Sequence, residues 1–228
     1  MRRTLTAYRV GRIGYGEAHA LQEKLVAARQ AGAIGDVVLL LEHDPPVLTL
    51  GRGSKPEHMT LPREAIEARG IEVYEAGRGG AVTYHGPGQL VGYPIVDLAP
   101  DRQDVKRYMR DLEEVMMRTA RDFGVESGRI DAKGYEGVWV KEPRAPERDR
   151  KLGAIGVRFS RWVTMHGFAL NVTTNLAHFS LFVPCGITDK GVTSLERLLG
   201  HALPMDEVAE TVARQFAALF SSELTYSK

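Results

Sequence analysis

The residues of this chain that could do chemistry gather in two separated segments and around one lysine. The first segment, 78–89 (RGGAVTYHGPGQ), combines four glycines with a cation, hydroxyls, an imidazole and an amide. Glycine lets the backbone take positive φ and lets a ligand approach the main chain closely. The segment matches neither the phosphate loop GxxxxGK[ST] nor a GxGxxG turn that opens a helix. It predicts a ligand-binding surface, and a plain hairpin turn is the alternative.

The second segment, 182–195 (FVPCGITDKGVTSL), contains the single cysteine of the chain, Cys185, between Pro184 and Gly186. Small neighbours leave room for a substrate beside the thiol. A thiol with its reference pKa near 8.5 is only about 3% ionised at pH 7, so catalysis needs a cation or a base beside it. The alternative is the commonest role of a free cysteine, a small buried hydrophobe.

The candidates for that cation or base are Lys151, His166, His178, His85 and Lys190. Lys151 differs from the others because it ends a polar loop and begins a small, apolar strand, LGAIGV, at whose mouth a lysine can point into a cleft. A surface lysine beside a loop is the alternative. His166 lies in an alternating strand, where a hydrogen-bonded structural role is more common for histidine. These patterns leave the partner of the thiol open.

The elements that position these residues follow from hydrophobic periodicity. Apolar residues at spacings of three and four predict helices at 16–33, 101–123 and 205–220, and a proline at the first turn predicts a short helix at 62–69. Strands are predicted at 4–10, 36–42, 47–50, 71–75, 90–98, 137–141, 152–159 and 163–172. The segment 142–150, with two prolines and six charges, is predicted to be a solvated loop.

The order of these elements, without regular strand–helix alternation, predicts an α+β fold: a mixed β-sheet with helices on one side. A chain of 228 residues can bury about 70% of its unfolded surface in one core. We therefore expect a single domain over residues 1–228.

Composition excludes several classes of protein. Hydrophobic residues are 43% and charged residues 26%, which excludes a disordered chain, and the net charge of +1 argues against a dedicated nucleic-acid binder. The longest aliphatic run, 37–41, is far shorter than the ~20 residues that a membrane helix needs. No apolar stretch follows the basic N-terminus, so no secretory signal is expected. A single thiol suits a reducing compartment and cannot supply a Cys-based metal site, so we expect a cytoplasmic protein without a metal.

Four separated motifs, taken in their order along the chain, resemble those of the octanoyltransferases of lipoate biosynthesis. These enzymes are the octanoyl-[acyl-carrier-protein]:protein N-octanoyltransferases. The motifs are RGGAVTYHGPGQLVGYPIVDL, KLGAIGVR, GFALNV and FVPCGITDKGVTSL. The resemblance implies an α+β fold related to the catalytic domains of biotin- and lipoate-protein ligases. Two positions depart from the pattern: Ala81 stands where relatives often carry a polar residue, and Gly153 where alanine is common.

The same resemblance implies roles for individual residues. Cys185 would be the acyl-thioester nucleophile, and Lys151 would lower the pKa of its thiol, since an opposite charge within about 4–6 Å shifts a pKa by about 1–3 units. The implied substrate-binding residues are Arg78, Gly79, Gly80, Ala81, Val82, Thr83, Tyr84, His85, Ala154, Ile155, Gly156, Gly167, Phe168 and Ala169. Of these, Val82, Ile155 and Phe168 are expected to wall the slot for the acyl tail.

The resemblance also implies partners. The octanoyl group would arrive on the phosphopantetheine of acyl carrier protein, with no further cofactor. It would pass to lipoyl domains of 2-oxoacid dehydrogenase complexes and to the glycine cleavage H protein. Arg144, Arg148 and Arg150 could steer the acidic carrier protein to the site.

Three alternatives remain. The nearest is an ATP-dependent lipoate- or biotin-protein ligase, which shares the glycine-rich segment and the lysine but needs no cysteine nucleophile. The others are a non-catalytic acyl-binding module and a hydrolase that pairs the thiol with His166 or His178.

Overall fold

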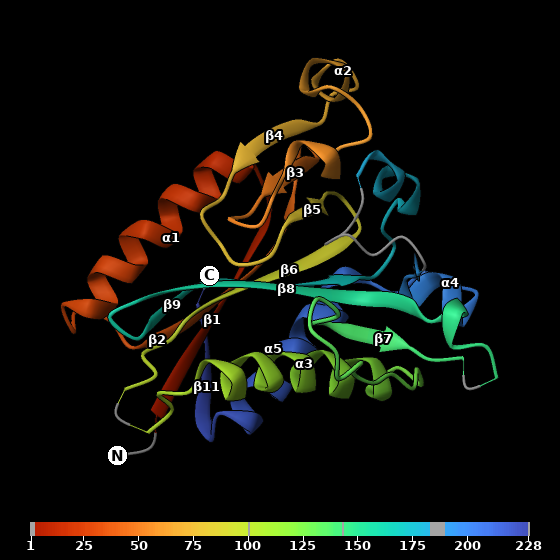
Figure 1. Cartoon of the computed structure of the whole chain (residues 1–228). Coiled ribbons are helices and arrows are strands. Elements are labelled where there is room, and N and C mark those ends of the chain that lie inside the picture. The colour runs from red at the N-terminus through yellow and green to blue at the C-terminus, as the bar shows by residue number, and fades with distance from the viewer. Residues whose placement is uncertain (1–2, 100, 143, 183–189, 228) are drawn as a thin grey trace.

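The larger of two β-sheets forms the centre of the molecule (Figure 1). The computed structural model describes residues 3–99, 101–142, 144–182 and 190–227. Across the sheet, the strands are β10 (Gly191–Val192), β8 (Arg150–Ser160), β9 (Val163–Asn171), β6 (Gln89–Ile95), β2 (Asp36–His43), β1 (Arg3–Ile13) and β11 (Ser222–Ser227), with β7 (Val138–Val140) also paired to β8. β1 is parallel to β2 and β11, whereas β2, β6, β9 and β8 form antiparallel pairs. The predicted mixed sheet is confirmed.

A second, three-stranded sheet stands on the larger one. β3 (Val47–Leu50) pairs in parallel with β4 (Glu72–Glu75) and antiparallel with β5 (Val82–His85). This sheet has its own apolar core, which includes Leu48, Ile66 and Tyr84. The chain leaves the large sheet at Pro45 and Pro46, and proline cannot donate to a strand ladder. The strand pattern of the sequence had predicted one sheet where the structure has two.

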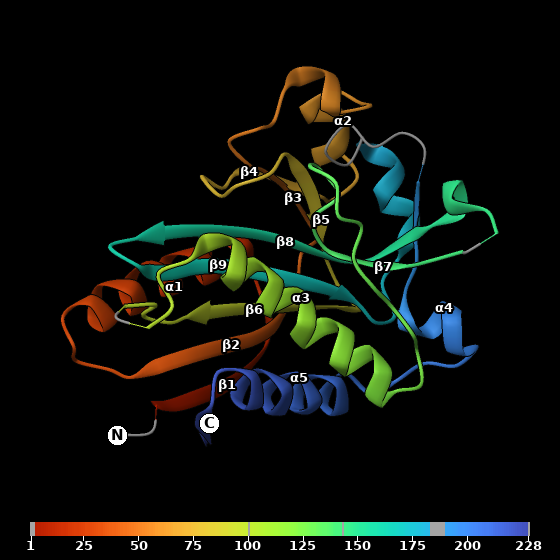
Figure 2. The same cartoon turned by 60° about the horizontal axis from the view of Figure 1, so that its bottom comes forward.

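Helices cover both faces of the large sheet (Figures 1 and 2). α1 (Tyr15–Gln30) packs on β6 and β9, and α3 (Val105–Asp122) and α5 (Met205–Leu219) pack on the opposite face. The prediction of helices on one side is therefore wrong. β2 shows the reason, because its apolar residues alternate between the core beneath α3 and α5 and the core beneath α1. A strand that is buried on both faces has a continuous apolar sequence. Such a sequence does not show whether helices cover one face of the sheet or both.

Local signals explain where α3 begins and ends. The Asp104 carboxylate accepts a hydrogen bond from the Arg107 N–H at 3.0 Å, so the helix begins after Asp104 and not at residue 101. Gly124, at φ +83°, follows its last turn. The remaining short helices are η1 (Pro56–His58), α2 (Arg63–Glu67), η2 (Pro146–Arg148), η3 (Leu176–Leu181) and α4 (Leu195–Leu199). Within the described ranges, no helix combines the length and the apolar character needed to cross a bilayer.

Candidate active site

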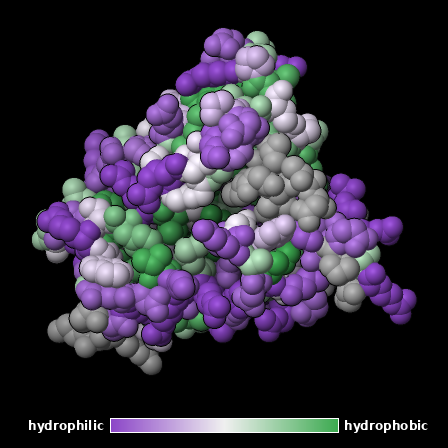
Figure 3. All heavy atoms as spheres, in the orientation of Figure 1, coloured by the Kyte–Doolittle hydropathy of each residue, from purple (hydrophilic) through white to green (hydrophobic). Residues whose placement is uncertain are grey.

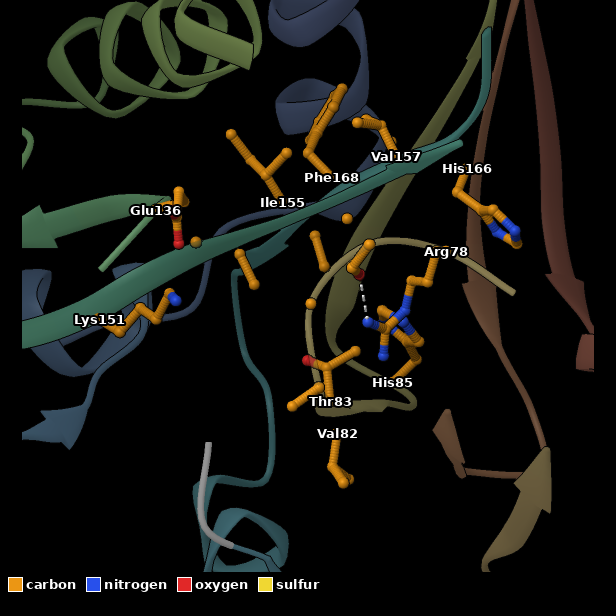
Figure 4. Close-up of a pocket in the computed structure, with 18 of the residues that line it drawn as sticks. Arg78, Val82, Thr83, His85, Glu136, Lys151, Ile155, Val157, His166 and Phe168 are labelled. Atoms are coloured by element: carbon orange, nitrogen blue, oxygen red, sulfur yellow. Dashed lines mark hydrogen bonds between the residues drawn. The ribbon is translucent and has the colours of Figure 1, made fainter. Parts of the chain in front are cut away.

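A cavity of about 420 Å³ lies between β5 of the small sheet and β8 and β9 of the large one (Figure 4). Its walls include residues from all three predicted binding segments and the predicted catalytic lysine. These are Arg78, Gly79, Gly80, Ala81, Val82, Thr83, His85, Lys151, Ala154, Ile155, Gly156, Gly167, Phe168 and Ala169. Hydrophobic residues gather in the middle of the face shown in Figure 3, with hydrophilic residues around them. The topology thus brings together residues that lie up to 91 positions apart in the chain, from Arg78 to Ala169.

Tyr84 is placed differently from its neighbours. Strand alternation directs Thr83 and His85 to the cavity and Tyr84 to the other face of β5. The Tyr84 hydroxyl lies 2.8 Å from Nδ1 of His178, and its ring packs edge-on against Phe179. Among the described residues, Tyr84 belongs to the core of the small sheet and not to the cavity wall. Its implied role in substrate binding is therefore not supported by its position.

Lys151 lies near one end of β8 and lines the cavity. Its Nζ lies 5.2 Å from the centroid of the buried Trp139 ring, a cation–π distance. The Lys151 carbonyl accepts a hydrogen bond from the Thr193 N–H at 2.9 Å, which fixes the start of β8 against the chain after β10. A Cβ on Gly137 would lie 2.8 Å from Cε of Lys151, so a glycine there leaves room for the lysine side chain.

Cys185, the predicted nucleophile, lies outside the described residues, as does everything from 183 to 189. The chain on both sides of that segment lines the cavity, at Phe182 and at Val192. Lys190, another of the candidate partners, lies 4.0 Å from the Asp149 carboxylate. The arginines of the predicted solvated loop, Arg144, Arg148 and Arg150, are exposed, although Asp149 within the same segment is buried.

Arg78 is buried and held by main-chain and side-chain oxygens. Its Nη2 donates to the carbonyl and to the hydroxyl of Thr49, both at 2.7 Å, and its Nη1 donates to the Gly79 carbonyl at 2.9 Å. The Gly79 N–H in turn donates to the Val157 carbonyl at 3.0 Å, which ties this loop to β8. Gly156 completes the fit, because a Cβ there would lie 2.8 Å from Cδ of Arg78.

A chain of three side chains continues from His85 through the interior of the sheet. Nδ1 of His85 lies 2.7 Å from Oε1 of Gln89, Nε2 of Gln89 donates to Asn171 at 2.9 Å, and Nδ2 of Asn171 donates to the Thr193 carbonyl at 2.9 Å. The Thr193 carbonyl can only accept, so the Asn171 side chain must direct its NH2 group to it and its Oδ1 to Gln89. The Gln89 NH2 group then donates to Asn171, which leaves Oε1 of Gln89 facing His85. Because Oε1 can only accept, Nδ1 of His85 must be the donor. Burial lowers the pKa of His85 well below 6.5, so the ring is neutral. Its Nε2 is then a bare acceptor in the cavity wall.

The sequence analysis placed the Gln89 amide on the ligand-binding surface but missed Asn171 and its contact with Gln89. Both are buried, and they stand opposite each other in the β6–β9 register. The signal was available: each is a polar residue at the end of a strand whose other positions are largely apolar, and such a residue needs a partner.

A second buried polar pair lies beside His85. Nδ1 of His43 donates to the Ile13 carbonyl at 3.1 Å, and its Nε2 accepts from the Tyr93 hydroxyl at 2.7 Å. The rings of His43 and His85 are 5.6 Å apart. Burial lowers the pKa of His43 to about 4 and raises the pKa of Tyr93 well above 10. Both groups are therefore neutral and serve to hold this wall in place.

The two histidines of the alternative hydrolase are poorly suited to act as bases here. Burial lowers the pKa of His166 to about 3, and a base this weak is far from the neutral pKa that general-base catalysis favours. His178 contacts Tyr84 behind the cavity wall. In the part of the chain that the structure describes, no group of three or more His, Cys, Asp or Glu side chains could hold a metal ion.

Several solved structures share the fold of this chain. A bipartite lipoate-protein ligase from Thermoplasma acidophilum superposes with a TM-score of 0.76 at 15% identity, covering 99% of this chain and 87% of that one. The biotin protein ligase of Aquifex aeolicus superposes at 0.52 with 11% identity, covering 96% and 70%. The predicted relation to the ligase catalytic domains is confirmed at the level of the fold.

Curated relatives are closer in sequence. The octanoyltransferase of Myxococcus xanthus is 52% identical over 96% of this chain, which spans 60% of that relative's length. The octanoyltransferase of Acidobacterium capsulatum is 48% identical over 97% of this chain and 92% of its own length. The sequence profile of the lipoyl protein ligase A/B catalytic domain matches residues 14–217. The chain therefore belongs to the lipoyl protein ligase A/B catalytic domain family and, within it, to the octanoyltransferases.

Proposed function

We propose that this protein moves an octanoyl group from octanoyl-acyl carrier protein to the lysine ε-amine of a lipoyl domain, through a thioester on Cys185 and without ATP. The observation that carries the proposal is the cavity itself. Lys151 lines the same cavity as a slot walled by apolar and small residues, and the chain on either side of the cysteine segment borders this cavity.

The slot suits a medium-length acyl chain. Two of the expected walls, Ile155 and Phe168, line the cavity. Val82 also borders it, but its side chain lies on the Tyr84 face of β5, in the core of the small sheet (Figure 4). Burying one methylene contributes about 0.8 kcal/mol, so the seven carbons beyond the carbonyl contribute roughly 5 kcal/mol to binding. Ala154 and Ala169 are paired across β8 and β9, and their small side chains leave the slot open.

In the first step, the Cys185 thiolate attacks the carbonyl carbon of the donor thioester. A new carbon–sulfur bond forms, the bond to the pantetheine sulfur breaks, and the departing thiolate takes a proton from the Lys151 ammonium. One thioester replaces another, so the step is nearly balanced and needs no ATP. A cation beside the cysteine favours the thiolate before attack.

In the second step, the acceptor lysine amine attacks the Cys185 thioester. A carbon–nitrogen bond forms, the carbon–sulfur bond breaks, and Lys151, now a free amine, takes the proton that the acceptor nitrogen loses. Amide formation makes this step downhill. The two steps together predict ping-pong kinetics.

The charged segment next to Lys151 suits an acidic donor. Arg144, Arg148 and Arg150 are exposed on the chain that leads into β8. Charges at the rim of an interface act mainly on the association rate. Replacing them should therefore slow acylation by the carrier protein more than acylation by octanoyl-pantetheine, which lacks the acidic protein.

The decisive experiment incubates the protein with octanoyl-acyl carrier protein in the absence of ATP and follows its intact mass. We expect an adduct of one octanoyl group that hydroxylamine removes and that Cys185→Ala abolishes. Alkylation rate against pH should give a low thiol pKa in the wild type and a higher one in Lys151→Ala. Lys141→Ala, at an exposed lysine close in sequence, is the matched control and should leave the profile unchanged.

Two outcomes would refute the proposal. A Cys185→Ala protein that still transfers octanoyl to a lipoyl domain would eliminate the thioester intermediate. An absolute requirement for ATP would instead favour the ligase alternative.

A further inference from the structure

The two ends of the cavity differ in chemistry. Figure 4 shows Lys151 at one end and Arg78, His85 and His166 gathered at the other. Gly156, against which Arg78 packs, lies five positions after Lys151 on β8. At about 3.3 Å per strand residue, roughly 16 Å of strand separates them. The acyl slot proposed above therefore runs along β8 from the reacting end towards a buried guanidinium.

The far end is polar, closely packed and rigid. Arg78 and Thr49, its partner, are almost fully buried. A Cβ on Gly51 would lie 2.7 Å from Nη1 of Arg78, and one on Gly80 would lie 3.5 Å from it, so glycine backbone encloses the guanidinium. It can leave this position only by losing its hydrogen bonds to Thr49, each of which is costly to leave unmade in a buried site.

The imidazoles beside it present bare polar atoms. Nε2 of His166 is buried and has no hydrogen-bond partner within the described residues. The polar chain through Gln89 leaves Nε2 of His85 as an acceptor. Both histidines line the cavity. An alkyl chain that reached Nε2 of His85 would exclude water from it and supply no hydrogen bond in return, and Nε2 of His166 is already buried without a partner among the described residues.

The available length matches a chain of eight carbons. With carbon–carbon bonds of about 1.5 Å in a zigzag, an extended octanoyl chain spans about 9 Å. The Lys151 side chain, the carbonyl and the contact shells at both ends occupy most of the remaining length. Further methylenes would meet the guanidinium.

We propose that Arg78, held by Thr49 and flanked by His85 and His166, is the end wall of the acyl slot and sets the longest acyl chain that the enzyme accepts. This inference rests on the transferase function proposed above. Up to the wall, each added methylene strengthens binding about fourfold. Beyond it, the chain must bend or displace the guanidinium from Thr49.

The test measures the rate at which acyl-pantetheine thioesters of six, eight, ten and twelve carbons acylate the protein, followed by intact mass. The wild type should improve by about sixteenfold from six to eight carbons and fall at ten. Arg78→Met replaces the planar charged end by a shorter apolar chain. It should move the optimum to ten carbons and raise the ratio of the ten- to the eight-carbon rate by at least tenfold.

Two further variants keep the inference testable if Arg78→Met does not fold. Thr49→Val removes the hydroxyl acceptor with little change of shape and should raise the same ratio about threefold. Gly156→Ala places a methyl group where Arg78 and the slot meet, so it should move the optimum to six carbons. Arg158→Met, at an exposed position on the same strand and outside the cavity wall, is the control and should keep the wild-type profile.

The results separate the two proposals. Folded Arg78→Met and Thr49→Val proteins with the wild-type chain-length profile would overturn the end wall and leave the transferase function intact. A wild-type protein that forms no acyl adduct with any of the thioesters would refute the transferase mechanism itself.

Discussion

Nδ1 of His85 lies 2.7 Å from Oε1 of Gln89, and this contact joins the cavity wall to the interior of the large sheet. Because the chain of amides ends on the Thr193 carbonyl, its direction is not free. A main-chain atom next to the start of β8 thus determines which nitrogen of a histidine in the cavity wall bears the proton.

Gln89→Glu should raise the pKa of His85. The variant puts a carboxylate at hydrogen-bond distance from Nδ1, and an opposite charge at this distance raises a histidine pKa by about 1–3 units against the lowering effect of burial. Titration of the His85 ring protons by NMR measures the shift. Gln103→Glu, at an exposed glutamine, should leave the His85 pKa at its wild-type value. An unshifted His85 in Gln89→Glu would show that the contact does not exist in solution.

His43→Gln should reduce the acid sensitivity of the fold. Burial lowers the pKa of His43 from 6.5 to about 4, so between these two pH values the unfolded chain binds a proton that the folded chain does not. The free energy of unfolding therefore falls with decreasing pH in this window, by up to about 1.4 kcal/mol per pH unit, and the contribution is complete above pH 6.5. Denaturant unfolding between pH 4.5 and 6 should show a shallower slope for the variant.

The matched control for that experiment is His201→Gln, because His201 is exposed. It should keep the wild-type slope. His43→Gln with an unchanged slope would mean that His43 takes up its proton equally in the folded and unfolded states.

Gly167→Ala should destabilise the large sheet. A Cβ at this position would lie 2.2 Å from the Gly92 carbonyl oxygen and 2.6 Å from Cδ of Pro94, and neither group can move without shifting β6. Overpacking of this kind costs about 1–3 kcal/mol. Urea unfolding of the variant measures it. Gly191→Ala meets only Cγ of Arg150 at 3.9 Å and should unfold within about 0.5 kcal/mol of the wild type; equal losses in both variants would contradict the close approach.

Tyr84→Phe should lower stability without changing acyl transfer per folded molecule. The variant removes the hydroxyl that meets His178 at 2.8 Å and keeps the ring that packs on Phe179. A net hydrogen bond contributes about 1 kcal/mol. Thermal unfolding and the acylation rate are measured on the same preparation. An acylation rate lowered tenfold in a folded variant would restore the substrate-binding role that the family resemblance implied for Tyr84.

Periodicity predicted the long helices and most strands, because each buries a face large enough to impose a repeat on the sequence. Periodicity failed to predict elements that bury little surface or whose pairing depends on distant parts of the chain. β11 (SELTYS) is mostly exposed at the sheet edge and gave no strand signal. The break at Pro45 and Pro46 was visible, but its result, a separate small sheet, depends on pairing with β4 and β5 that no local pattern encodes.

The sequence predicted which segments contribute to the candidate site. It did not predict most of the contacts between their side chains. Motif order predicted that Arg78, Lys151 and Phe168 contribute to one site, and all three line the same cavity. The sequence could not place Tyr84 behind the wall, since one strand carries both faces. Nor could it reveal that Gln89 and Asn171 meet, because their pairing depends on the register of β6 and β9.

The edge strands of the large sheet disfavour its association with another copy of the molecule. At one margin, the strands that pair with β8 are short, with two residues in β10 and three in β7. At the other, β11 presents serine, glutamate and threonine side chains beside β1. A short or polar border offers little to a strand from another molecule. Removing β11 would expose the long backbone ladder of β1, and we expect such a truncated chain to aggregate through that newly opened border even though the cavity lies at the opposite side of the sheet.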